Sequence, residues 1–364
     1  MFEYTLKGIV NNGDGLSLAL YYSDQNLDDR TIVKIQNGEF TFHGSCDYMK
    51  ELYIRFEKNI DNPSGYHRTL VHTEPGVITI RFDVTSDPSY YRFSNFEVLT
   101  GPDNIFRRQF FTEYKKALGE RPLWIFPESS QMDYMRKYVY PAPRSRVLKL
   151  YEQYFAEETS AIHLYLLKSI TDQTQGPGEF KGEYLKMKEI ELIRNLFSKL
   201  DPNLAPGLDY QRVKVAVEQL GHASPEINFV DDTLLSINEA EIQLSKLVQE
   251  NRLTVLTFWH TSCGPCRAFN KEISKQYLEL KAVGIEFISL NVDDSKTLWK
   301  KSSEEDAITW PNLYIGRASV LLARYRINCF PSKRVYDKNL ALVSMDVQNN
   351  ASWWTTLKDK VSDL

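Results

Sequence analysis

A pair of cysteines shortly after an apolar run constrains the fold of this chain more than any other feature. Residues 253–259 (Leu-Thr-Val-Leu-Thr-Phe-Trp) are almost continuously apolar, as expected of a strand buried on both faces. Residues 267–283 carry apolar side chains at helical spacing. The sequence therefore predicts a strand-to-helix junction in which Cys263, the first residue of Cys263-Gly-Pro-Cys266, lies at the helix N-terminus.

A Cys-x-x-Cys pair can be half of a zinc site or a redox pair. Structural zinc needs four ligands, and no second Cys-x-x-Cys or His pair at ligand spacing follows Cys266. At a helix N-terminus, free N–H groups and the helix dipole favour a thiolate. The pKa of a thiol placed there falls to about 3.5–7.5, from about 8.5 when free. The placement therefore favours redox chemistry, and we expect no metal site.

The pattern around the cysteines continues as an alternation of strands and helices. Residues 285–292 form a second apolar run, and residues 294–307 have helical spacing. Two short strands, 334–337 and 341–347, are separated by Lys-Asn, and a final helix is predicted near 351–364. This order predicts an α/β arrangement, a mixed sheet covered on both faces.

The N-terminal part of the chain has a different pattern. Residues 1–102 alternate apolar and polar positions between Gly, Asn and Pro turns, which is typical of an antiparallel β sandwich or barrel. The strands are predicted at 2–10, 16–22, 31–35, 39–44, 51–57, 76–84 and 90–99. This region shows no acid/base constellation, and Cys46, just after a strand, is interpreted as a structural thiol.

Residues 103–222 form a helical middle region. Apolar and aromatic side chains recur there at three- and four-residue spacing, and Pro- and Gly-containing clusters separate the helices. We interpret the aromatic stripes, and His163 within one of them, as packing residues. The chain is thus predicted to be multidomain, with a β-rich domain at 1–102, helices at 103–222 and an α/β domain at 223–364.

Composition limits the classes of function. A chain of 364 residues is long enough for two or three domains. Its 44 Lys and Arg against 48 Asp and Glu give a net charge of −4, which argues against a nucleic-acid partner. No apolar run approaches the roughly 18–20 residues of a membrane span. The first residues lack the pattern of a signal peptide, and four cysteines are too few for a disulfide scaffold.

These motifs together resemble a known family. Residues 258–267 (Phe-Trp-His-Thr-Ser-Cys-Gly-Pro-Cys-Arg) and Phe330-Pro331 before a hairpin are similar to thioredoxin-fold thiol–disulfide oxidoreductases of the TlpA/ResA type. Residues 223–229 resemble the entry segment of that family, so the resemblance covers 223–364. The β-rich start with its helices resembles a region of unknown function that precedes such modules in exported proteins of anaerobic Gram-negative bacteria.

The resemblance implies a mechanism. Cys263 would attack a substrate disulfide and form a mixed disulfide, which Cys266 would resolve. Pro331 matches the cis-proline of the family, so Cys263, Cys266 and Pro331 are the expected catalytic residues. The expected substrate-binding residues are Trp259, Gly264, Pro265 and Phe330.

The resemblance also implies a cellular setting. The expected substrates are protein disulfides, and the Gly-Pro between the cysteines resembles that of reducing thioredoxins. A membrane or periplasmic thiol is the expected electron donor, the location is the periplasm or cell envelope, and no cofactor is expected.

Several positions depart from the family pattern. Ser262 stands where Trp usually precedes the first cysteine. Thr257 and Phe269 occupy the two positions at which the family usually has an acidic or amide side chain beside the resolving thiol. Glu272 and His260 are the candidates to replace that acid/base group.

Cys329, two residues before Pro331, stands where the family often has Gly. It is interpreted either as a small buried residue or as a redox-sensitive third thiol. Two alternatives to the oxidoreductase also stay open. One is a binding or scaffold protein with a weakly active or vestigial thioredoxin module. The other, less favoured, is a thiol peroxidase, which generally uses a lone peroxidatic Cys in a different motif.

Overall fold

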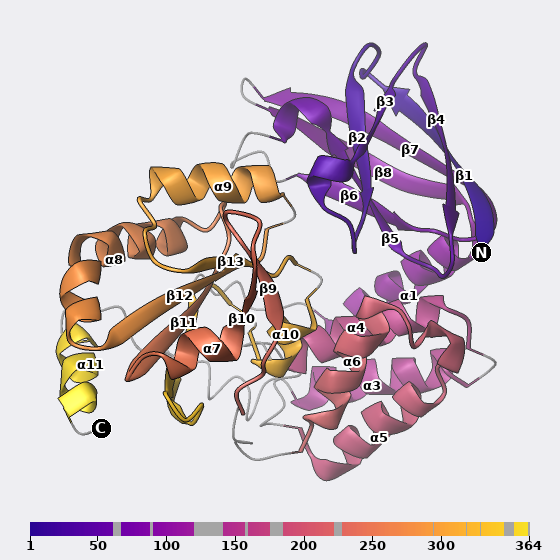
Figure 1. The fold of residues 1–364 in the computed structure, drawn as a ribbon. Helices are drawn as coiled ribbons and strands as arrows, with labels where there is room; N and C mark the ends of the chain where they lie inside the picture. Colours follow the sequence, from indigo (N-terminus) through magenta and orange to yellow (C-terminus); the bar gives the residue numbers. More distant parts are fainter. Residues whose placement is uncertain are drawn as a thin grey trace. The chain divides into compact units, whose positions relative to one another are not determined.

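The computed structural model describes residues 1–60, 67–87, 90–119, 141–156, 159–174, 185–221, 228–293, 295–317, 319–327, 329–345 and 353–362. The chain forms two compact units (Figure 1). Unit 1 comprises Met1–Asp24 and Arg30–Ala223, and unit 2 comprises Gln25–Asp29 and Ser224–Leu364. The expected entry segment at 223–229 lies mostly outside the described residues. Among the described residues, the longest and most apolar helices fall short of what a membrane crossing requires.

Unit 1 contains two four-stranded sheets. The first has the order β4-β1-β7-β8 and the second the order β3-β2-β5-β6. Their strands are β1 (Phe2–Asn11), β2 (Ser17–Tyr22), β3 (Thr31–Lys34), β4 (Glu39–Cys46), β5 (Glu51–Phe56), β6 (Arg68–His72), β7 (Gly76–Asp87) and β8 (Tyr90–Thr100). Short 3-10 turns occur at Leu27–Asp29 (within unit 2) and Glu57–Asn59 (in unit 1).

One core joins the two sheets of unit 1. Leu6 and Ile80 come from the first sheet and Leu20 and Ile54 from the second, and all are buried in one apolar cluster. The expectation of a purely antiparallel arrangement is wrong, because β1 pairs with β7 in parallel. Alternation of side chains reports which face of a strand is buried but not the direction of its neighbour.

The helices of unit 1 follow β8. They are α1 (Pro102–Leu118), α3 (Pro141–Tyr154), α4 (Ile162–Thr174), α5 (Met187–Ser198) and α6 (Leu208–Glu218), with a 3-10 turn at Pro202–Leu204. Their apolar faces form a second core of unit 1. His163 is buried and its ring contacts Phe106 and Phe155, which confirms its interpretation as a packing residue.

Unit 2 is built on a seven-stranded mixed sheet of order β10-β9-β13-β12-β11-β14-β15. Its strands are β9 (Thr233–Ser236), β10 (Glu241–Gln243), β11 (Leu253–Trp259), β12 (Ile285–Asn291), β13 (Asn312–Tyr314), β14 (Ser332–Asp337) and β15 (Leu342–Met345). The central β11 is parallel to β12 and antiparallel to β14. The short strands β9, β10 and β13 were not predicted from the sequence.

Helices cover both faces of this sheet, as predicted from the alternation. They are α7 (Leu244–Gln249), α8 (Gly264–Ala282), α9 (Lys296–Glu305), α10 (Val320–Arg324) and α11 (Trp353–Ser362). α8 and α11 pack on one face, where Ile273 and Leu357 meet Val255. α7 and α10 pack on the other face, where Val248 and Leu321 meet residues of β11 and β12.

Candidate redox site at the start of helix α8

The two cysteines of the motif form a disulfide at the N-terminus of α8. The sulfur atoms of Cys263 and Cys266 are bonded. Cys263 is the N-cap residue, and its Sγ accepts a hydrogen bond from the Cys266 N–H at 3.1 Å. Cys263 is 7% exposed and Cys266 is fully buried, while Gly264 and Pro265 between them are exposed. Of the two cysteines, Cys263 is thus the more accessible to an attacking thiol.

Aromatic rings pack around the disulfide. Trp259, at the end of β11, and Trp299 of α9 are fully buried in one cluster with both cysteines, and Phe330 packs against that cluster. The expectation that Trp259 contacts substrate therefore needs correction. Its side chain has no exposed surface, so it supports the cysteines from inside the domain.

The loop before β14 completes the rim of the site. The Phe330–Pro331 peptide bond is cis, as the resemblance predicted. The ring of Phe330 meets the imidazole of His260 edge-on, with 5.0 Å between ring centroids. His260 Nδ1 lies 2.9 Å from Ser262 Oγ. His260 and Phe330 are thus neighbours beside the cysteine motif.

A buried carboxylate holds the chain just before the cysteines. Asp293, after β12, is 3% exposed and accepts hydrogen bonds from the N–H and the hydroxyl of Thr261, at 3.0 and 2.9 Å. The Asn291 side chain also donates to Asp293, at 2.7 Å. Since charge-assisted hydrogen bonds are the stronger kind, Asp293 fixes the loop that leads from β11 to Cys263.

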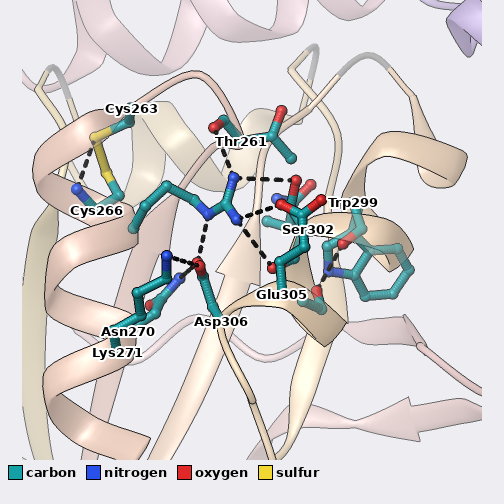
Figure 2. Close-up of polar contacts among 12 residues, drawn as sticks. Thr261, Cys263, Cys266, Asn270, Lys271, Trp299, Ser302, Glu305 and Asp306 are labelled. Atoms are coloured by element: carbon teal, nitrogen blue, oxygen red, sulfur yellow. Dashed lines mark hydrogen bonds and ion pairs between the residues drawn. A yellow bond between two sulfur atoms is a disulfide. The ribbon is translucent and has the colours of Figure 1, made fainter. Parts of the chain in front are cut away.

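A second buried carboxylate holds the chain just after the cysteines (Figure 2). Arg267 Nε donates to Asp306 Oδ2 at 2.5 Å, and its Nη2 donates to the exposed Glu305 at 2.8 Å. Asn270 of α8 also donates to Asp306, at 3.2 Å. Partial burial acts to lower the pKa of Arg267, but the bonds to Asp306 and Glu305 raise it above its ordinary value. The first turn of α8 is thereby fastened to the end of α9.

The two positions at which the family pattern has an acidic or amide side chain are filled by neutral or apolar side chains. Thr257 Oγ1 lies 3.1 Å from Ser289 Oγ, and Trp310 donates to the same Ser289 hydroxyl at 2.8 Å. Phe269 is buried one helical turn after Cys266. The suggestion that Glu272 replaces the missing acid is wrong, because Glu272 is exposed and contacts Lys275 and Gln276.

The two free cysteines lie in opposite environments. Cys46 is buried at the end of β4, as expected of a structural thiol. Cys329 is exposed, with its Sγ 3.7 Å from Ser332 Oγ. The interpretation of Cys329 as a small buried residue is therefore wrong. In the part of the chain that the structure describes, no cluster of three or more His, Cys, Asp or Glu residues is arranged to hold a metal ion.

Sequence reasoning missed the carboxylates of Asp293 and Asp306. Each lies more than 30 residues from the segment that it holds, with separations of 32 residues from Thr261 and 39 from Arg267. The available signal was local: Asp293 follows a predicted buried strand at its carboxyl end, where site residues of open α/β sheets gather.

Two known families match this chain. Residues 221–339 match the AhpC/TSA family, and residues 4–101 match a domain of unknown function, DUF4369. The chain thus combines a thioredoxin-like domain with an N-terminal DUF4369 domain.

Curated relatives match about a quarter of the chain. The thiol-disulfide oxidoreductase ResA of Bacillus subtilis is 34% identical over 88 residues, which cover 24% of this chain and 46% of that protein. ResA of Geobacillus kaustophilus is 31% identical over 84 residues, covering 23% of this chain and 48% of that protein. The chain spans about half the length of these relatives, and both are named as thiol-disulfide oxidoreductases.

Solved structures also resemble the chain in part. The thioredoxin domain of a thiol-disulfide oxidoreductase from Bacteroides vulgatus aligns with 37% of this chain and 95% of its own, at 21% identity and a TM-score of 0.34. A thiol-disulfide oxidoreductase from Bacteroides fragilis aligns with 37% of this chain and 98% of its own, at 18% identity and a TM-score of 0.34.

Proposed function

We propose that this chain is a thiol–disulfide oxidoreductase that exchanges disulfides through Cys263 and Cys266. The observation that carries the proposal is the disulfide at the N-terminus of α8, in which Cys263 is the N-cap and retains 7% exposure while Cys266 has none. This asymmetry assigns a different role to each sulfur. The names of the curated relatives support the same class of reaction.

The geometry supports the following exchange. In the reduced protein, the Cys263 thiolate at the helix N-terminus attacks a substrate disulfide, and one substrate sulfur leaves as a thiolate. The Cys266 sulfur then attacks Cys263 in the mixed disulfide, which releases the second substrate sulfur and re-forms the Cys263–Cys266 bond. Two electrons pass from the protein to the substrate. The exposed Gly264 and Pro265 and the half-buried Phe330 and Pro331 form the surface that would meet the substrate chain.

We place this activity in the cell envelope and in the reducing direction. The Gly-Pro between the cysteines resembles that of reducing thioredoxins, and the resemblance to exported TlpA/ResA-type proteins supports the periplasmic setting. Protein disulfides are then the substrates, and a membrane or periplasmic thiol supplies the electrons. Cys263, Cys266 and Pro331 are the proposed catalytic residues.

The experiment is reduction of insulin disulfides, with dithiothreitol to recycle the protein. Wild type should accelerate insulin precipitation, and Cys263→Ser should reduce the rate to that of dithiothreitol alone. Cys46→Ala is the matched control, because Cys46 is a free and buried cysteine of unit 1, and it should retain the wild-type rate. Equal rates for wild type and Cys263→Ser would reject the proposal.

A second candidate function is a binding or scaffold protein with a weakly active thioredoxin module. The observation that favours it is the absence of a carboxyl group at Thr257 and Phe269, so that no acid at those positions assists Cys266. The same assay separates the two functions. A folded wild-type protein that is no faster than Cys263→Ser would support the scaffold.

A further inference from the structure

Lys333 is a buried lysine beneath α8 that the exchange described above does not use. It lies in β14, two residues after the cis-proline, and is only 3% exposed. Lysine is almost never fully buried unless its charge is matched by something nearby.

The register of the sheet places Lys333 on the face that α8 covers. Lys333 pairs with Thr257 across the antiparallel strands β14 and β11, and paired residues project to the same face of a sheet. Two residues along each strand, Val255 and Val335 lie on that face and pack against α8. The Lys333 side chain therefore lies in the layer between the sheet and α8.

The ammonium lies close to the turn of α8 that carries Cys266. Lys333 Nζ is 4.3 Å from the centroid of the Phe269 ring, a distance at which a cation is attracted to an aromatic face. Phe269 follows Cys266 by three residues, so the two side chains are neighbours on one face of α8. The buried Cys266 sulfur and the Lys333 ammonium thus share the same layer.

Opening the disulfide places a negative charge in this layer. When Cys263 is attacked, the electron pair of the S–S bond goes to Cys266, which is fully buried. A buried anion is costly unless an opposite charge is near. The sheet offers the hydroxyls of Thr257 and Ser289 and the indole of Trp310, all neutral. The neighbouring Arg267 is already bound to Asp306.

We propose that the buried ammonium of Lys333 stabilises the Cys266 thiolate, in a site where Thr257 and Phe269 offer no acid/base group. The inference rests on the proposed function and names a further residue of the same site. Stabilising the thiolate shifts the equilibrium between disulfide and dithiol toward the reduced form.

The step balances as follows. A donor thiolate attacks Cys263 Sγ and forms a new S–S bond, the Cys263–Cys266 bond breaks, and Cys266 leaves as a thiolate. Lys333 retains its proton during this step, or passes it to Cys266 and regains one from water. A second donor thiolate then releases Cys263, and the donor dithiol is oxidised by two electrons as the protein disulfide is reduced.

The first experiment measures the equilibrium of the full-length protein with reduced and oxidised glutathione, by alkylation and mass. Lys333→Met should lower the equilibrium constant for the reduced form by about fivefold or more, because the thiolate loses its counter-charge. Lys333→Arg keeps the charge and should stay within about twofold of wild type. Lys338→Met is the matched control, since Lys338 is an exposed lysine in the β14–β15 turn, and it should leave the equilibrium unchanged.

The second experiment titrates the ultraviolet absorbance of the Cys266 thiolate in a Cys263→Ser background that also carries Cys46→Ala and Cys329→Ala, because both of those cysteines are free thiols. The thiolate should form at higher pH with Met at position 333 than with Lys or Arg. If thermal unfolding shows that Lys333→Met is not folded, Lys333→Gln is used as the neutral variant in the same titration. Unchanged glutathione equilibrium and unchanged thiolate titration in a folded Lys333 variant would overturn the inference. Failure of the proposed function is distinguishable, because it shows as a wild-type protein that does not reduce insulin.

Discussion

Buried charges serve different purposes in the two units. In unit 1, Lys168 of α4 lies 3.2 Å from Glu51 of β5 and 2.8 Å from Asp209 of α6, with all three side chains largely buried. These ion pairs tie helices to a sheet. In unit 2, Asp293 and Asp306 hold the segments on either side of the two cysteines. Buried charged groups thus hold helices against a sheet in unit 1, whereas in unit 2 they position the segments on either side of the cysteines.

The pKa directions in unit 1 agree with this structural role. Burial acts to raise the pKa of Glu51, but the charge of Lys168 and the hydrogen bond from Tyr53 lower it below its ordinary value. Burial acts to lower the pKa of Lys168, but Glu51 and Asp209 raise it. Both groups are therefore charged at neutral pH, and each depends on the other for its counter-charge.

Of the proposed substitutions, Lys168→Met should lower the free energy of unfolding the most. It leaves two buried carboxylates without their cation, which costs about 3–5 kcal/mol, so urea unfolding of unit 1 should move to much lower concentration. Insulin reduction by unit 2 under native conditions should persist. Lys214→Met is the control, because the Lys214–Glu218 pair is exposed, and it should cost less than about 0.5 kcal/mol.

Asp306→Asn and Glu305→Gln together compare a buried and an exposed carboxylate partner of the Arg267 guanidinium. Asp306 has no exposed side-chain surface, whereas half of the Glu305 side chain is exposed, and both bind Arg267. Removing the buried charge should destabilise unit 2 by about 1.5–3 kcal/mol and slow insulin reduction. Glu305→Gln should cost less than about 1 kcal/mol. Equal losses of stability in the two variants would show that burial does not set the strength of these pairs.

A smaller effect is expected from lowering the pH. Burial, with smaller contributions from Arg107 and Lys168, holds the pKa of His72 well below its ordinary value. The unfolded chain therefore binds a proton near pH 6.5 that the folded unit 1 excludes, so stability is present above that pH and falls below it. Between pH 6.5 and 5.5, wild type should lose about 1 kcal/mol more than His72→Phe in urea unfolding. Identical losses in both proteins would contradict the assignment.

Some features of the candidate site could be predicted from the sequence, and others could not. The cysteine pair and its strand-to-helix junction were predictable, because burial of β11 and the periodicity of α8 are local patterns. The clamps formed by Asp293 and Asp306 were not, since they join segments distant in sequence. Lys333 was also missed, because a lysine in a strand is ordinarily interpreted as facing solvent. The strand β6 was not predicted either, because it is short and its side chains show no clear alternation of burial.

The central claim is that Cys263, at the start of α8, is the attacking sulfur. The most direct measurement mixes the Cys266→Ser variant, which lacks the resolving thiol, with a peptide disulfide and locates the adduct by peptide mass mapping. We predict a stable mixed disulfide on Cys263, because this residue is the N-cap of α8 and is the more exposed cysteine of the pair. An adduct found first on Cys329 or Cys46, or no adduct on Cys263, would contradict the account.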